Sequence, residues 1–166
     1  MTTSPALLVE AFTDQPLQGN GAAVVLLDQP ATADWMQRLA GSFKQSETAF
    51  LHRESAGPWR LRWFTPTCEV PLCGHATLAA TFALAHWGLL EGGASLPLAT
   101  RSGALQVGLD DSKAHVAHLV LPSSGLIPLG SLGEGATLTF DEKVAILRTL
   151  VAAAGDKPIA PGIAAL

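Results

Sequence analysis

The chain has 166 residues, of which 48% are hydrophobic and 14% charged, with a formal net charge of −4. Such a length allows one domain with a sizeable core, or barely two small ones. The few basic residues are scattered, which argues against nucleic acid as a partner. No apolar run reaches the ~20 residues of a membrane span, and the first residues lack a secretory signal pattern. Two cysteines do not indicate a secreted disulfide framework, so we expect a cytoplasmic protein without a membrane partner.

The first part of the chain alternates apolar segments with turn-forming residues. Thr32 is a suitable N-cap for a helix over residues 33–42, whose large apolar residues fall on one face. The turn before residue 22, rich in Gly, Asn and Pro, predicts that the first two strands form a hairpin. Strands are predicted at residues 6–13, 22–27, 47–53 and 61–64.

The segment that follows organises the rest of the chain. Residues 76–87 are almost all small or apolar, and a helix that is apolar on nearly every side must be buried, here as the axis of a domain. Cys73, Gly74 and His75 stand where the backbone begins this helix. Free N–H groups at such an end favour a carboxylate or phosphate by roughly 0.3–1 kcal/mol. A thiol and an imidazole at the same place make it a candidate reaction centre.

Three more strands are predicted after this helix, at residues 96–101, 105–109 and 115–121. Together the elements predict an α+β lobe in which an antiparallel sheet surrounds one embedded helix and carries one covering helix. This lobe is expected to occupy residues 1–121. Residues 122–166 are interpreted as a linker, an amphipathic helix over residues 141–154 and a tail.

Three stretches, QGN-x-AAVVLL, QSETAFL and LRWFTPTCEVPLCGHATLAA, resemble the phenazine-biosynthesis-like (PhzF-type) isomerase family. The resemblance implies a fold shared with diaminopimelate epimerase, with two lobes that are each a curved sheet around a central helix and an active site between them. Family members need no cofactor or metal and commonly dimerise. Only the N-terminal lobe is recognisable, because the family's second-lobe motif has no counterpart after residue 122.

The resemblance also implies roles for particular residues. Glu47, in the Ser-Glu-Thr motif, is expected to be the acid/base, with His75 as its catalytic neighbour. One departure is that Gly21 stands where the family usually has proline, which restores freedom in φ and would loosen the turn. The residues expected to bind substrate are Asn20, Ser46, Cys73 and Gly74.

Each of these residues also has a purely structural interpretation. A Glu at the start of a strand is usually just solvated, and His75 could merely cap its helix. For Cys73 we place inert packing before catalysis, because buried cysteines are often fillers. Glu69 is expected to make a structural hydrogen bond. Cys68, Cys73 and His75 lack the paired spacing of a zinc site, so no metal is expected.

The functional expectation is a cofactor-independent isomerase that moves a proton between carbons of a small carboxylate substrate. Since one lobe would leave its cleft wall uncovered, a second copy of the chain or a separately encoded second lobe is expected as partner. Two alternatives stay open. One is a catalytically silent, truncated lobe that acts as a binding or assembly module. The other is an amino-acid racemase or epimerase that depends on Cys73.

Overall fold

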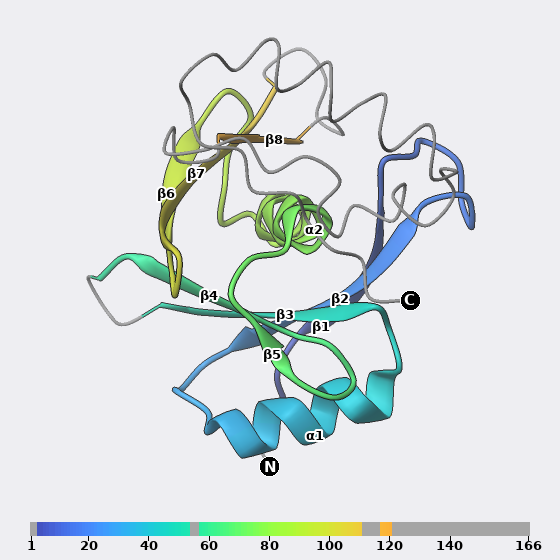
Figure 1. Cartoon of the computed structure of the whole chain (residues 1–166). Coiled ribbons are helices and arrows are strands. Elements are labelled where there is room, and N and C mark those ends of the chain that lie inside the picture. The colour runs from blue at the N-terminus through green and yellow to red at the C-terminus, as the bar shows by residue number, and fades with distance from the viewer. Residues whose placement is uncertain (1–2, 54–56, 111–116, 121–166) are drawn as a thin grey trace, which may run out of the picture. The chain divides into compact units, whose positions relative to one another are not determined.

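An eight-stranded sheet curls around one helix in the part of the chain that the computed structural model describes, residues 3–53, 57–110 and 117–120 (Figure 1). The elements are β1 (Ala6–Ala11), β2 (Asn20–Leu27), α1 (Ala33–Phe43), β3 (Glu47–Arg53), β4 (Trp59–Phe64), β5 (Glu69–Val70), α2 (Gly74–His86), β6 (Ser95–Thr100), β7 (Gly103–Leu109) and β8 (Ala117–Val120). These residues belong to one compact unit that ends at Val120. The linker, helix and tail predicted for residues 122–166 lie outside the described residues.

Helix α2 is the buried axis that its composition predicted, and it begins at Gly74, two residues earlier than expected. Its many alanines let β1, β2, β3, β7 and β8 approach it closely, as Figure 1 shows. Two of its polar side chains are satisfied within the helix: Thr77 donates to the Cys73 carbonyl and Thr81 to the Thr77 carbonyl. Neither helix in the described part of the chain is long and apolar enough to cross a membrane.

The α+β class and the curled sheet around a central helix are confirmed, but the sheet is not antiparallel throughout. The strand order is β1-β2-β3-β4-β6-β7-β8, with the short β5 paired to β4. β2 pairs with β3, and β4 with β6, in parallel. Parallel neighbours need a crossover connection, and α1 and α2 each provide one. The predicted hairpin of the first two strands is confirmed.

Helix α1 covers the outer face of the sheet. Thr32 is its N-cap, as predicted, and accepts a hydrogen bond from the Trp35 amide at 3.3 Å. The helix ends before Lys44, which adopts a left-handed conformation with φ 54°. Met36 and Ala40 are buried against a second apolar cluster that includes Phe50 of β3. The sheet is therefore covered by α2 on its inner face and by α1 on its outer face (Figure 1).

Strand β3 lies between these two layers and is buried along almost its whole length. Because successive side chains of a strand point to opposite faces, its residues divide between the two helices. Ala49 and Leu51 belong to the core around α2, whereas Phe50 belongs to the core under α1. Glu47 has the same parity as Ala49, so its carboxylate is directed toward α2.

Candidate active site at the start of α2

The start of β3 and the start of α2 bring two titratable side chains together. Glu47 is the first residue of β3, and His75 is the second residue of α2. Their side chains are 10% and 1% exposed, and Glu47 Oε2 lies 3.3 Å from His75 Nε2. Both residues were predicted to be catalytic from the sequence. The fold places them in contact although strands β4 and β5 and the loops around them lie between the two residues in the sequence.

The Glu47 carboxylate is buried without a full set of partners. Its contact with His75 is short enough for an ion pair but is not aligned as a hydrogen bond, and Oε2 has no hydrogen-bond partner among the described residues. An unsatisfied buried polar atom costs about 1–3 kcal/mol. Such an atom in a native structure calls for an explanation, and a functional role is one.

Ser46 and Asn20, both predicted to bind substrate, stand beside this pair. The Ser46 hydroxyl donates to the Gly21 carbonyl at 2.9 Å. The same oxygen lies 3.2 Å from His75 Nε2. Asn20 Oδ1 is 3.5 Å from Ser46 Oγ, the limit of a hydrogen bond. These contacts join the first residue of β2 to the His75 imidazole through Ser46.

Cys73 and Gly74 form the backbone at the start of α2. Cys73 is the N-cap in an extended conformation, and its side chain makes no capping hydrogen bond. Instead, its sulfur lies 3.3 Å from His75 Nδ1. Gly74 is the first helical residue, so the first amides of α2 have no partner within the helix. This end of α2 combines amide donors with a thiol, an imidazole and a nearby carboxylate.

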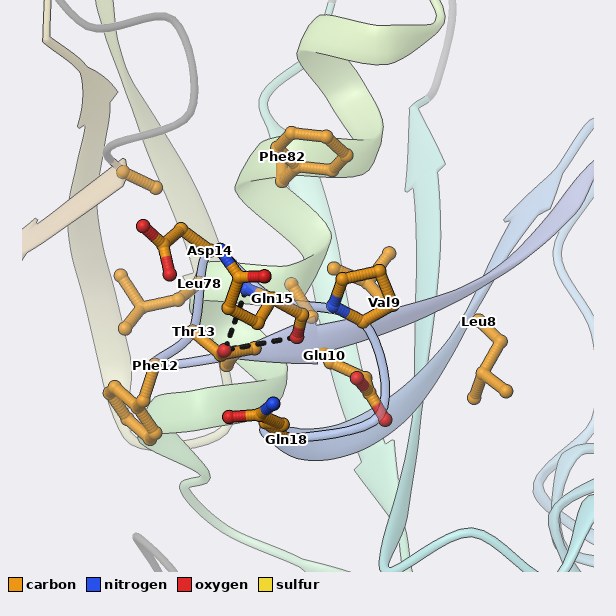
Figure 2. A pocket seen from close by; sticks show the side chains of 14 residues that line it. Leu8, Val9, Glu10, Phe12, Thr13, Asp14, Gln15, Gln18, Leu78 and Phe82 are labelled. Carbon is orange, nitrogen blue, oxygen red and sulfur yellow. Dashed lines mark hydrogen bonds between the residues drawn. The ribbon is translucent and has the colours of Figure 1, made fainter.

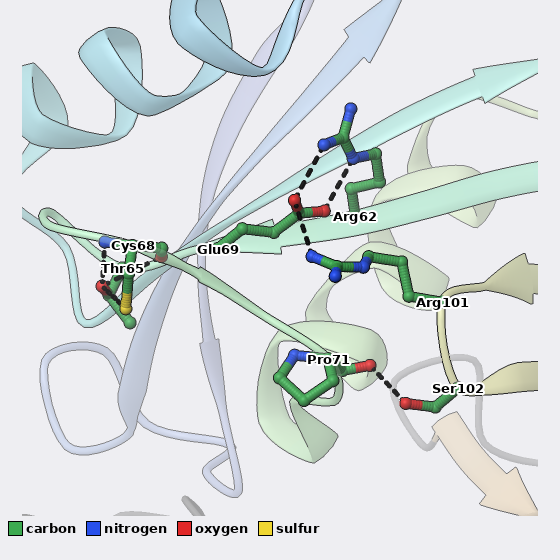
Figure 3. A network of polar contacts seen from close by, with 7 residues as sticks. All are labelled: Arg62, Thr65, Cys68, Glu69, Pro71, Arg101 and Ser102. Carbon is green, nitrogen blue, oxygen red and sulfur yellow. Dashed lines mark hydrogen bonds and ion pairs between the residues drawn. The ribbon is translucent and has the colours of Figure 1, made fainter.

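A second polar network holds the segment that leads into α2 (Figure 3). Glu69 of β5 accepts two hydrogen bonds from Arg62, at 2.7 and 2.8 Å, and pairs with Arg101 at 3.0 Å. The structural hydrogen bond predicted for Glu69 is confirmed. The hydrogen bond from Arg62 holds the pKa of the Glu69 carboxyl below its ordinary value, although burial acts in the opposite direction. The same bond raises the pKa of the Arg62 guanidinium.

This network ties three elements around the loop before the helix. Arg62 comes from β4 and Arg101 from the turn between β6 and β7, while Ser102 in that turn donates to the Pro71 carbonyl at 2.7 Å. Neither arginine was predicted from the sequence to belong to this network. The signal for Arg62 was a charged residue inside the apolar run LRWF, whereas Arg101 lies 32 residues from Glu69 and had no local signal.

One set of donor atoms could hold a metal ion. Three buried residues each offer one donor atom, and these atoms all lie within 4.8 Å of one another. The residues are Glu47, Cys73 and His75. Sulfur, nitrogen and carboxylate oxygen together suit a zinc-like cation. From the sequence, Cys68 was considered as a zinc ligand together with Cys73 and His75. In the fold Cys68 is exposed and contacts Thr65 instead. The expectation of no metal therefore rested on a different set of residues, and it stays a prediction.

An open pocket of about 840 Å³ lies elsewhere, between β1, the loop after it, α2 and Ala117 of β8 (Figure 2). Its apolar wall includes Leu78 and Phe82, the next turns of α2 beyond His75, and its rim carries Glu10 and Asp14. None of the predicted site residues lines it. We place the candidate site at the start of α2, because the unsatisfied carboxylate and a buried cluster of titratable groups lie there, whereas Glu10 in the pocket is half-buried and Asp14 is exposed.

The glycines on either side of Asn20 lie in crowded surroundings, and the role of Gly21 differs from the one expected. A Cβ at Gly19 would lie 2.6 Å from the Ala11 carbonyl oxygen, so only glycine fits at this position, just before β2. Gly21 does not loosen a turn: it lies inside β2, paired with Glu10, and its φ is not positive. A Cβ at Gly21 would meet Gln45 Oε1 at 3.0 Å.

Comparison with known proteins agrees with this architecture. A family model described as phenazine biosynthesis-like protein matches residues 9–137. The chain belongs to this phenazine biosynthesis-like family. A curated relative, an uncharacterized isomerase of Halalkalibacterium halodurans, is 48% identical over 107 residues, which are 63% of this chain and 39% of the relative. The chain spans 39–41% of the length of three such curated isomerases.

Solved structures of the phenazine biosynthesis-like family and its neighbours share the fold. A PhzF-family protein from Enterococcus faecalis has a TM-score of 0.61 and 37% identity, over 66% of this chain and 42% of that one. A predicted epimerase from Pseudomonas aeruginosa has a TM-score of 0.57 and 27% identity, over 63% of this chain and 38% of that one. The likeness to both kinds of protein confirms the expected epimerase-like fold.

Proposed function

We propose that this chain carries one half of the active site of a cofactor-independent isomerase that moves a proton between carbons of a small carboxylate. The observation that carries the proposal is the buried Glu47 carboxylate, 3.3 Å from His75 at the start of α2, with an oxygen that has no hydrogen-bond partner in the described part of the chain. A free carboxylate oxygen in a nearly dry site is suited to accept a proton from carbon. The isomerases among the relatives support the reaction class.

In this mechanism the first amides of α2 bind the substrate carboxylate. The first N–H groups of a helix have no partner within the helix, and they and the positive end of the helix dipole favour an anion. Glu47 Oε2 accepts the proton from one carbon while the electron pair moves into the conjugated system of the substrate. The same proton is then returned to a second carbon, so that the carboxylate is regenerated. His75, in contact with Glu47, fixes the carboxylate in position.

A partner is part of the proposal. The chain spans about two fifths of the length of the related isomerases, and we propose that a partner supplies the opposite wall of the substrate cleft. Three large apolar side chains are exposed on β1 and in the loop after it: Leu8, Phe12 and Leu17. Exposed apolar surface of this kind favours association. A second copy of the chain, or a separately encoded second lobe, would complete the site.

Deuterium incorporation from D₂O into a panel of small unsaturated and amino carboxylates tests the proposal. We expect the wild-type chain to catalyse exchange at carbon with at least one of them, and Glu47→Gln to lower the rate about 100-fold or more. Glu91→Gln, on an exposed carboxylate in the loop after α2, is the matched control and should leave the rate unchanged. Exchange that survives in Glu47→Gln would refute the role of Glu47. Absence of exchange with every carboxylate would favour a binding or assembly module.

One observation favours a second candidate, a racemase or epimerase that uses Cys73 as its base. The Cys73 sulfur is buried 3.3 Å from His75 Nδ1, and a helix N-terminus lowers the pKa of a thiol in general. This mechanism needs a thiolate, which serine cannot replace near neutral pH. Exchange that is abolished in Cys73→Ser but retained in Glu47→Gln would select the racemase over the isomerase.

A further inference from the structure

We propose that Arg101 and Ser102, the two residues of the turn between β6 and β7, are positioning residues that hold the chain entering α2 and so place the amides at the start of that helix. The anchoring of this segment stands on contacts between described residues alone. Its consequence for substrate binding rests on the proposed function, because the amides concerned are those proposed to bind the substrate carboxylate.

The segment that enters α2 has little regular structure of its own. Strand β5 consists of Glu69 and Val70, and α2 begins at Gly74. Residues 71–73 between them belong to no helix or strand. Groups that bind a ligand must be held within about 0.5 Å of the productive geometry by the residues that support them. The amides at the start of α2 therefore depend on how firmly the preceding segment is fixed.

The turn between β6 and β7 contacts this segment at two points (Figure 3). Arg101 Nη1 pairs with Glu69 Oε2 at 3.0 Å, and the Ser102 hydroxyl donates to the Pro71 carbonyl at 2.7 Å. The two anchored residues lie on either side of Val70, whose backbone pairs with β4. Residues 69, 70 and 71 are thus each held, the first and the last of them by the same turn.

The turn that makes these contacts is well fixed itself. The Thr100 hydroxyl accepts a hydrogen bond from the Ser102 amide at 3.1 Å and donates one to the Gly103 carbonyl at 2.6 Å. Gly103 has a φ of 100°, a conformation that favours glycine. Antiparallel pairing joins β6 and β7 along the whole of β6, from Ser95 opposite Gly108 to the turn. A firm hairpin therefore presents both side chains to the segment before α2.

The exposure of these contacts separates positioning from general stabilisation. The Arg101 side chain is 62% exposed, and Ser102 and Pro71 are exposed as well. Exposed ion pairs and exposed hydrogen bonds contribute little to the stability of a whole domain. They can still restrain a short irregular segment, whose local opening costs much less than global unfolding. Loss of either contact should therefore loosen the start of α2 and leave the sheet intact.

Amide hydrogen exchange, followed by NMR without any substrate, measures this loosening. The Thr77 amide, which donates to the Cys73 carbonyl at 3.1 Å, reports on the first turn of α2. We expect Ser102→Ala to speed exchange of this amide about three- to tenfold, the effect of one neutral hydrogen bond, and to leave the amides of β2 and β3 unchanged. Ser102→Thr keeps the hydroxyl and should restore the wild-type rate. Ser95→Ala, which removes an exposed hydroxyl at the other end of the same hairpin, is the matched control.

Carbon exchange in D₂O adds a readout that belongs to substrate binding. We expect Ser102→Ala and Arg101→Gln each to raise KM about three- to tenfold with kcat nearly unchanged, because Glu47 and His75 are untouched. Ser102→Thr should again behave like the wild type. A general loss of folded protein would lower the measured kcat instead.

Several results would overturn the proposal. They are a Thr77 amide that exchanges at the wild-type rate in both Ser102→Ala and Arg101→Gln, an equal increase in Ser95→Ala or throughout the sheet, and an active wild type whose KM neither variant changes. If neither variant folded, the contacts would be structural and the proposal would be wrong. If the wild type catalyses no carbon exchange but Ser102→Ala loosens Thr77, the proposed function fails and the anchoring survives.

Discussion

At the scale of single residues, the proposed role of Glu47 predicts that its carboxylate is kept at the expense of stability. Its Oε2 is buried with no hydrogen-bond partner among the described residues. Replacing the carboxylate by an amide of the same size removes the buried charge. We therefore expect Glu47→Gln to raise the free energy of unfolding, by about 1 kcal/mol, or to leave it unchanged. Urea denaturation at neutral pH measures the free energy of unfolding, with Glu91→Gln as the neutral surface control. If Glu47→Gln lowered this free energy by more than about 1 kcal/mol, Glu47 would be a structural residue.

The Glu69 network has a defined pH dependence. The hydrogen bond from Arg62 lowers the pKa of Glu69 in the folded state below its ordinary value of 4.5. A carboxyl with a lowered folded-state pKa stabilises the fold above the unfolded-state pKa, and the contribution is lost as pH falls through the folded-state value. The difference in unfolding free energy between wild type and Glu69→Gln should have its largest value at pH 7. It should decrease below about pH 4.5 and disappear as the pH falls below the folded-state pKa.

Urea titrations of both proteins across this range provide the measurement. Asp34→Asn is the control, because the Asp34–Arg38 pair on α1 is largely exposed and should contribute little at any pH. A difference between wild type and Glu69→Gln that does not change with pH would mean that the ion pairs of Glu69 with Arg62 and Arg101 do not stabilise the fold.

Most residues of the candidate site could be named from the sequence, but the contacts between their side chains could not be predicted. The Ser-Glu-Thr and Cys-Gly-His motifs named residues that the fold brings together, because the first begins a strand and the second begins a helix. The roles predicted for them remain predictions. The contact of Cys73 with His75 Nδ1 and the pairing of Arg101 with Glu69 depend on side-chain direction and on a hairpin distant in sequence. No local pattern encodes either.

At the scale of elements, the alanine-rich surface of α2 sets how tightly the sheet can curl. Ala80 has no exposed surface and belongs to the core around this helix. A leucine there adds three carbons where the strands already touch the helix. We expect Ala80→Leu to lower the free energy of unfolding by about 1–3 kcal/mol. Thermal or urea denaturation measures the decrease in the free energy of unfolding, and the same substitution at the exposed Ala33 of α1 is the control. Equal decreases at the two positions would contradict tight packing around α2.

Strand directions were the part of the fold that local pattern did not predict. Apolar runs bounded by turn-forming residues predicted most strands, and the all-round apolar composition predicted α2 as the axis. The directions depend on connections: each helix carries the chain across a face of the sheet, so the strands on either side of it become parallel neighbours. The two-residue strand β5 was also missed, since Glu69 and Val70 are too few to show a period.

At the scale of the whole molecule, the chain resembles one part of longer isomerases and exposes apolar side chains at one sheet edge. If a second copy completes the site, light scattering should give twice the mass of a single chain at micromolar concentration. Phe12→Asp, which places a charge at one of the three exposed apolar side chains Leu8, Phe12 and Leu17, should shift this equilibrium toward monomer by about tenfold or more. Wild-type chains that remain monomeric at every concentration would contradict self-association and leave a separately encoded lobe as the partner.

In the proposed function, ligand recognition takes place at the start of α2. Chemical-shift mapping of the ¹⁵N-labelled chain with a series of small carboxylates tests it most directly. We predict that the largest shifts fall on the amides of Gly74, His75 and Ala76 and on Glu47, and that Glu47→Gln alters binding much less than it alters exchange. Shifts that instead cluster on Gln15, Leu78 and Phe82, in the open pocket beside β1, would contradict the account.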